Sequence, residues 1–144
     1  MILKRQKSLC SNSVLRMYVT DAHGFIWFLT GDEKLGKNAR EVFLSADKGD
    51  IPIVIPSIVL LETLHVCEKQ KAELRFKNVL DKIQDTLNYP VYPLDTRIVV
   101  ECQNLKQIPD SHDRVIVATA KLLNAKLITK DEEIKESGLV EVVW

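Results

Sequence analysis

The sequence predicts an α/β fold, a three-layer α/β/α sandwich in which helices cover both faces of a central parallel sheet. Short apolar runs rich in β-branched residues alternate along the chain with segments whose apolar residues recur at helical spacing. That alternation is typical of parallel strands joined by helical crossovers. The 144 residues suit one domain with its own core, and no internal repeat or low-complexity stretch marks a second domain.

The N-terminal stretch differs from the rest of the chain. Residues 1–16 contain four Lys or Arg and no acid, and their apolar residues show no period. We therefore expect a flexible N-terminal extension at residues 1–16, followed by a single domain at residues 17–144.

Apolar periodicity gives the order of elements in the first half of this domain. We expect a strand at residues 17–20, a helix at 22–29, a helix with Leu35, Ala39, Val42, Phe43 and Ala46 on one face, a strand at 51–55 and a helix at 58–66. The run at 51–55 is β-branched and bracketed by prolines, which is typical of a short buried strand. Ser57 is then placed to cap the helix that follows.

The second half continues the alternation. We expect a helix at residues 76–87, a strand at 91–94, a helix at 98–105, a helix at 112–124, a strand at 127–129, a short helix at 132–135 and a strand at 140–143. Either Asp110 or Ser111 is placed to cap the helix that begins near His112.

Charge and cysteine content exclude several classes of protein. Twenty Lys and Arg balance twenty Asp and Glu, so any nucleic-acid contact must be a local patch and not an overall basic field. Cys10, Cys67 and Cys102 are far apart, which fits reduced thiols. No stretch approaches the roughly 18 apolar residues of a membrane span. We expect a cytoplasmic protein with no membrane partner.

Three acidic residues are predicted to lie at one edge of the sheet. In an open parallel sheet the functional crevice lies beyond the carboxyl ends of the strands. Asp21 ends the first strand, and Asp131 follows the strand at 127–129. Asp113 lies in the first turn of a helix that begins at the same edge. Each of the three could also be structural, as the end of a strand, a partner of the helix dipole or a helix cap.

Glu62 is the acid that a structural role explains least well. With Ser57 as the cap it lies about 7.5 Å into its helix, but helical side chains lean toward the N-terminus, so its carboxylate can reach back to the edge. Its helical neighbours Ile58, Val59 and Val66 are apolar. A carboxylate on an apolar face is costly unless a partner compensates its charge.

A hard divalent cation would compensate all of these charges. Oxygen ligands alone favour Mg²⁺ or Mn²⁺, and such a cation can activate water for hydrolysis of a phosphodiester. We therefore expect four residues to act both as metal ligands and in catalysis, namely Asp21, Glu62, Asp113 and Asp131. The histidines lack zinc-ligand spacing, and the glycines form no phosphate-binding loop.

At these residues the sequence resembles the PIN-domain family, and especially the VapC-type toxins of toxin-antitoxin pairs. The resemblance covers residues 17–144. It rests on the segments at 18–23, 56–62, 109–120 and 127–131, of which the third, with Asp110-Ser111-His112-Asp113, is the most specific. Two features depart from the family: Ser111-His112 replaces the frequent Pro-Phe, and the basic start is longer than usual.

The resemblance implies a Mg²⁺- or Mn²⁺-dependent endoribonuclease that hydrolyses RNA phosphodiester bonds, with a central first strand, a homodimer and a cognate antitoxin protein as partner. By position it adds Asp110 as a further acid and Thr129 as a hydroxyl near the metal. Cations close to the site are candidates for RNA contact, namely Arg114 and Lys130. Further candidates earlier in the chain are Lys34, Lys37 and Arg40.

Three alternatives stay open at this point. A non-toxin PIN-domain nuclease that processes RNA and a catalytically inactive PIN-like interaction module would share the fold. An aspartyl-phosphate enzyme also places an aspartate after a parallel strand, but the segment Asp21-Ala22-His23 lacks the second acid that such enzymes carry there.

Overall fold

Five parallel strands form the sheet of the computed structural model, which describes residues 16–69 and 73–144. The strands are β1 (Tyr18–Thr20), β2 (Ile53–Pro56), β3 (Val91–Tyr92), β4 (Lys126–Ile128) and β5 (Val142–Val143). They lie in the order β3-β2-β1-β4-β5, so the first strand is central, as the family resemblance implied. The extension expected at residues 1–16 lies, apart from Arg16, outside the described residues.

Helices alternate with these strands. In chain order they are α2 (Ala22–Thr30), α3 (Lys37–Asp47), α4 (Ser57–Lys69), α5 (Phe76–Asp85), α6 (Thr96–Cys102), α7 (Ser111–Leu122) and α8 (Glu132–Ser137). Every expected strand and helix is present, and the strand ends differ from the expected ones by at most two residues. None of the helices in the described part of the chain has the length and apolar character needed to cross a membrane.

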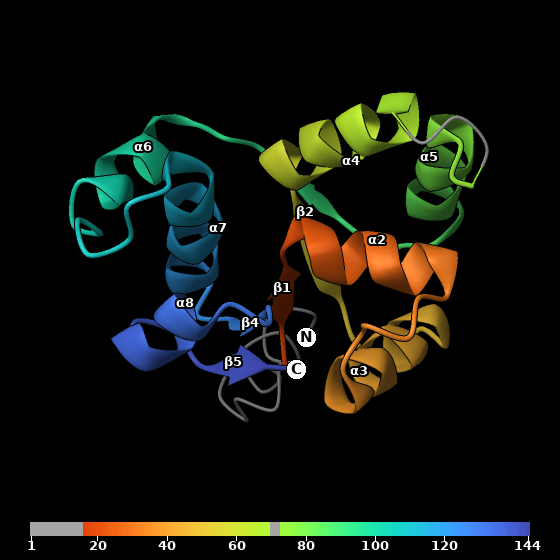
Figure 1. Ribbon diagram of the computed structural model, residues 1–144, viewed down its shortest axis with the longest axis horizontal. Helices are drawn as coiled ribbons and strands as arrows, with labels where there is room; N and C mark the ends of the chain where they lie inside the picture. The colour runs from red at the N-terminus through yellow and green to blue at the C-terminus, as the bar shows by residue number, and fades with distance from the viewer. Residues whose placement is uncertain (1–15, 70–72) are drawn as a thin grey trace, which may run out of the picture.

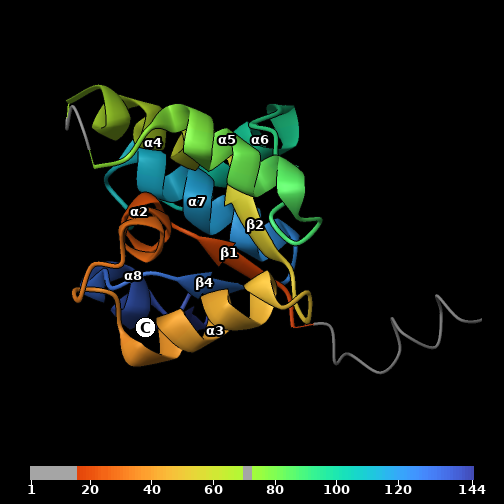
Figure 2. The ribbon, with the colours of Figure 1, turned by 90° about the vertical axis from the view of Figure 1, so that its right-hand side faces the viewer.

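The sheet lies between two helical layers, which confirms the predicted sandwich. Helix α7 packs against β1, β2 and β4 on one face, and α3 lies on the other side of the sheet (Figures 1 and 2). The side chains of Val19, Ile55 and Leu127 are fully buried. Burial on both faces explains why these strands are continuously apolar and do not alternate with polar residues.

The register of the sheet brings two strand ends together. Thr20 at the end of β1 pairs with Ile128 at the end of β4. The backbone N–H of Asp21, one residue further, donates to the carbonyl of Ile128 at 3.0 Å. The residues that follow β1 and those that follow β4 therefore lie side by side at the carboxyl edge of the sheet.

The prediction that Ser57 caps the following helix from outside is wrong. Helix α4 begins at Ser57 itself, and the Ser57 hydroxyl accepts the backbone N–H of Leu94 at 3.1 Å. Leu94 follows β3, the strand next to β2, so the hydroxyl joins the ends of two neighbouring strands and is not used within the helix. Glu62 is consequently the sixth residue of α4.

Trp144 lies against the backbone of Gly36, just before α3. A Cβ placed on Gly36 would lie 2.5 Å from the carbonyl carbon of Trp144 and 2.6 Å from its ring atom Cδ1. Figure 2 shows the end of the chain between α3 and α8. The position therefore requires glycine because of the close approach of the two backbones.

Gly36→Ala is expected to lower the free energy of unfolding by about 1–3 kcal/mol, because the added methyl group forces the Trp144 backbone to move. Urea denaturation measures the effect. Lys37→Ala is the matched control, since Lys37 is exposed and should change stability by no more than about 0.5 kcal/mol. Equal stabilities of the Gly36→Ala variant and the wild type would contradict the contact.

Candidate functional site

Four acids from separate elements converge at the carboxyl edge of the sheet. Asp21 follows β1, Asp131 follows β4, Glu62 lies in α4 and Asp113 lies in the first turn of α7. The pKa of Asp113 reflects how close these acids are. It is raised to about 6, first by burial and then by the negative charges of Asp110 and of the other three acids. A carboxylate that is repelled by four others is held in a cluster of like charge.

Three of the aspartates at this edge also cap helices. Oδ1 of Asp21 accepts the backbone N–H of Gly24 at 2.8 Å, and Oδ1 of Asp131 accepts that of Ile134 at 3.0 Å. Asp110 caps α7 through the N–H of Asp113, also at 3.0 Å. Capping fixes one oxygen of each carboxylate. The second oxygen of each carboxylate takes no part in the cap and can bind a ligand.

Thr129 links two of the acids. It is almost fully buried, and its Oγ1 accepts the backbone N–H of Asp131 at 3.2 Å. The same hydroxyl hydrogen-bonds the carboxylate of Asp21. Because a hydroxyl has one proton to donate and lone pairs to accept with, Thr129 can serve both aspartates at once. Thr129 was expected near the metal on the resemblance alone, and its contacts give that expectation a geometric basis.

Burial dominates the electrostatics of Asp21. Desolvation raises the pKa of its carboxyl, the hydrogen bonds from Thr129 and from the Gly24 N–H lower it, and the nearby charge of Asp131 raises it again. The net direction is upward. The carboxylate form is therefore less stable here than in water, which is the condition under which a bound cation stabilises it most.

Glu62 contacts His112, a partner that the sequence analysis missed. Nδ1 of His112 lies 3.2 Å from Oε1 of Glu62, and the two side chains are 55% and 29% exposed. The sequence analysis assigns His112 no role, because the histidines lack zinc-ligand spacing. The only available signal was its position beside Asp113, because the 50 residues between Glu62 and His112 hide their proximity.

The predicted RNA-contacting cations have different surroundings. Arg114 is partly buried, and its Nε donates to the carbonyl of Ile108 in the loop before α7. Lys130 is exposed, and its Nζ lies 5.2 Å from the centre of the Trp27 ring. Arg114 thus has a structural contact within the fold, whereas the Lys130 ammonium lies at the surface beside Asp131. Contact with RNA stays a prediction for both.

The donor set fits a hard divalent cation. The converging groups are carboxylates with a buried hydroxyl beside them, and such oxygens are what Mg²⁺ and Mn²⁺ prefer. The repulsion that raises the pKa of Asp113 is also what a cation would relieve. Within residues 16–69 and 73–144, no three acidic, histidine or cysteine side chains are arranged as a ready-made metal site.

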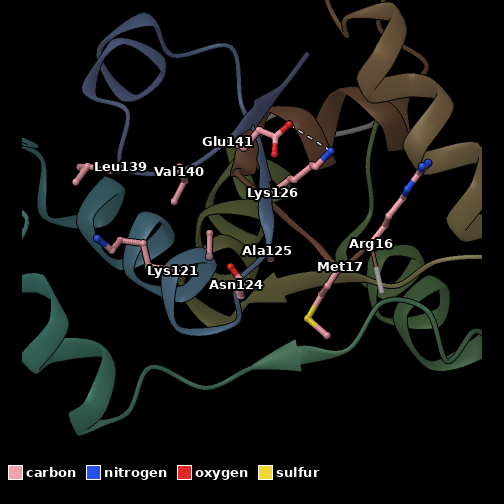
Figure 3. A pocket seen from close by; sticks show the side chains of 10 residues that line it. Arg16, Met17, Lys121, Asn124, Ala125, Lys126, Leu139, Val140 and Glu141 are labelled. Atoms are coloured by element: carbon pink, nitrogen blue, oxygen red, sulfur yellow. Dashed lines mark ion pairs between the residues drawn. The ribbon is translucent and has the colours of Figure 1, made fainter. Parts of the chain in front are cut away.

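A hollow lies at the opposite, amino-terminal edge of the sheet (Figure 3). It has a volume of about 570 Å³ and lies where β1 and β4 begin, next to the last turn of α7. Lys126 and Glu141 form an ion pair there at 3.3 Å, and Lys121 also lines it. None of the four acids lines this hollow, so it is separate from the site.

Comparison with known proteins gives a consistent result. A family model described as PIN domain matches residues 18–138. The fold is similar to that of VapBC2 from Rickettsia felis bound to a promoter DNA fragment, with a TM-score of 0.68 and 20% identity over 89% of this chain and 98% of that one.

Two further solved structures are also similar. They are a toxin-antitoxin complex from Klebsiella pneumoniae (TM-score 0.65, 18% identity, 88% of this chain and 96% of that one) and DNA-bound VapBC from Salmonella typhimurium (TM-score 0.65, 18% identity, 89% and 97%). No curated protein matches this chain significantly.

Proposed function

Because the chain belongs to the PIN-domain family, a family of nucleases, we propose that it is a Mg²⁺- or Mn²⁺-dependent endoribonuclease that hydrolyses RNA phosphodiester bonds. The observation that carries the proposal is the convergence of Asp21, Glu62, Asp113 and Asp131, which the raised pKa of Asp113 reports. A cluster of like charges destabilises the fold unless a bound ligand offsets the repulsion.

Each side chain has a distinct part in the proposed reaction. The four acids would hold the cation, which when bound supplies Lewis-acid activation of water and neutralises charge on the phosphate. Thr129 hydrogen-bonds the Asp21 carboxylate and accepts the backbone N–H of Asp131, so it would hold both residues in place. His112 orients Glu62. Lys130, exposed beside Asp131, is placed to neutralise a phosphate of the substrate.

We propose further that the enzyme is the toxin of a toxin-antitoxin pair. The support is the likeness to three solved toxin-antitoxin complexes, each of which this chain matches over nearly the whole of the other chain. On this proposal the partners are RNA, a cognate antitoxin protein and a second copy of the chain. A short neighbouring reading frame with a DNA-binding N-terminus would support the toxin role, and its absence would favour a solitary RNA-processing nuclease.

Cleavage of a structured RNA pool tests the nuclease proposal. We expect cleavage with Mg²⁺ or Mn²⁺ and none with a chelator. Glu62→Gln keeps the size of the side chain and its contact with His112 but removes the charge, so cleavage should fall by about 100-fold or more. Glu68→Gln, an exposed glutamate of the same helix, is the matched control and should leave the rate unchanged. Cleavage that persists in chelator or in Glu62→Gln refutes the site.

Thr129→Val is expected to lower cleavage by about 10–100-fold, the range for partners that orient metal ligands. It should also lower the free energy of unfolding by about 1–3 kcal/mol, because the N–H of Asp131 loses its acceptor. Rate measurements at saturating metal and urea denaturation check both effects. Thr129→Ser keeps the hydroxyl and should retain most of the activity; if Ser and Val behave alike, the hydroxyl has no such role.

A further inference from the structure

A second hollow adjoins the acidic edge and shares residues with it. Its volume is about 510 Å³, within the range of about 300–1,000 Å³ that small-molecule sites have. Thr129 and Asp131 line it on the side of the acids, Asn38 lines it from α3, and Trp144 closes it at the end of β5. Whatever occupies this hollow therefore lies next to Asp131, one of the four acids.

One of the two tryptophans of the chain lines this hollow, and the other packs against it. Trp144 is the lining residue, and the Trp27 ring lies edge-on to Trp144 with 5.8 Å between the ring centres. The ring of His23, which is also in α2, lies 5.2 Å from the Trp27 ring. Both tryptophans pack against the core while remaining partly exposed. The rings thus have fixed positions and a surface that a flat ligand can reach.

Two lysines lie close to the Trp27 ring, and a third lines the hollow. The ammonium groups of Lys34 and Lys130 lie 5.3 and 5.2 Å from the centre of the Trp27 ring, within cation-π distance. Lys135 lines the hollow from α8. The acids that line it are Asp131, a proposed cation ligand, and Glu132. With a cation bound at the acids, the charge beside Trp144 would be positive.

Fixed aromatic rings flanked by cations are the features with which proteins bind single-stranded nucleic acid, since every base has a face that stacks and every nucleotide has a phosphate. Asn38 adds an amide that can hydrogen-bond the edge of a base. A base in a duplex is stacked on both sides and cannot enter such a hollow. The combination therefore favours an unpaired nucleotide over a duplex.

We propose that this hollow binds the nucleotide next to the scissile phosphate of a single-stranded RNA, with the base on Trp144 and the backbone phosphate at Lys130. The inference rests on the proposed nuclease function and adds a nucleotide-binding subsite to it. The site then prefers unpaired RNA, and Trp144 sets affinity while the four acids set the rate of hydrolysis.

Binding without cleavage tests the inference. The full chain carrying Asp21→Asn, in which cleavage is expected to be at least about 100-fold slower, is titrated in Mg²⁺ with a short mixed-sequence single-stranded RNA and with a duplex of equal length. We expect the single strand to quench tryptophan emission, which reports on this hollow because Trp144 lines it and Trp27 packs against Trp144. In the same background Trp144→Leu should weaken affinity about 10-fold, and Trp144→Phe, which keeps an aromatic face, much less.

Charge variants provide a second measurement that does not depend on the packing of Trp144. Lys130→Gln should reduce the slope of log affinity against log salt by about 1. Lys121→Gln is the matched control, since Lys121 lines the hollow at the opposite edge (Figure 3) and should change neither affinity nor slope. Unchanged affinity in both Trp144→Leu and Lys130→Gln, or equal affinity for duplex and single strand, would overturn the inference.

Steady-state kinetics separate failure of the inference from failure of the proposed function. In the active chain, Trp144→Leu should raise KM for single-stranded RNA about 10-fold with little change in kcat, as loss of uniform binding does. If Trp144→Leu cleaves RNA with an unchanged KM, the proposed nuclease function holds and the proposed nucleotide site in the hollow is refuted. If the wild-type chain binds RNA through Trp144 but does not cleave it, the nucleotide site is supported and the nuclease function is refuted.

Discussion

Asp21→Asn should reduce RNA cleavage by at least about 100-fold while leaving the fold intact. Loss of a residue that merely orients a metal ligand costs about 10–100-fold, so loss of a ligand charge should cost more. The fold should survive because asparagine caps helices as well as aspartate does, and its side-chain oxygen can still accept the Gly24 N–H. Circular dichroism and urea denaturation establish that the variant is folded before its rate is measured.

Asp95→Asn is the matched control for this experiment. Asp95 caps α6 in the same way, with its Oδ1 accepting the N–H of Ile98 at 3.2 Å. It is not among the carboxylates that raise the pKa of Asp113. The Asp95→Asn variant should therefore cleave RNA at the wild-type rate. If both variants lose activity alike, the loss in Asp21→Asn does not report a metal ligand at residue 21.

Asp113→Asn should make the metal-free protein more stable at pH 7 while abolishing its activity. The folded pKa of about 6 lies above the unfolded value, so ionisation of Asp113 costs stability as the pH rises from about 4 to about 6 and the full cost is present at pH 7. The shift of about 2 units has an upper limit near 3 kcal/mol. Solvent screening of this partly exposed group reduces the expected gain to about 1–2 kcal/mol.

Thermal unfolding at two pH values measures this gain. At pH 7 and without metal, the Tm of Asp113→Asn should exceed that of the wild type by roughly 3–8 °C. At pH 4 and below the difference should shrink, because Asp113 is then protonated in the folded wild type. Mg²⁺ or Mn²⁺ should raise the Tm of the wild type more than that of the variant. A variant less stable than the wild type at pH 7 would show that the acids do not repel one another as inferred.

The order of elements and the four acids could be predicted because each depends on local signals. The apolar runs around Val19 and Ile55 marked buried strands, and a parallel sheet places the residue after each strand at one edge. Asp21 and Asp131 followed directly from that rule. They turned out to cap helices as well, which is the structural role that had been considered as the alternative to a functional one.

The contacts that could not be predicted join residues far apart in the chain. Ser57 was expected to cap α4, but Leu94 takes its hydroxyl because β2 and β3 end side by side. The approach of His112 to Glu62 has the same origin, since it depends on how α4 and α7 pack. No periodicity or spacing encodes such contacts, because each depends on the relative placement of two elements and not on the sequence around either residue.

The double use of these aspartates, as helix caps and as proposed ligands, has an evolutionary consequence. Aspartate and asparagine codons differ by a single nucleotide. An asparagine at residue 21 or 131 would keep its helix capped. One mutation can therefore silence the nuclease and leave a folded chain that still presents its surfaces to partners.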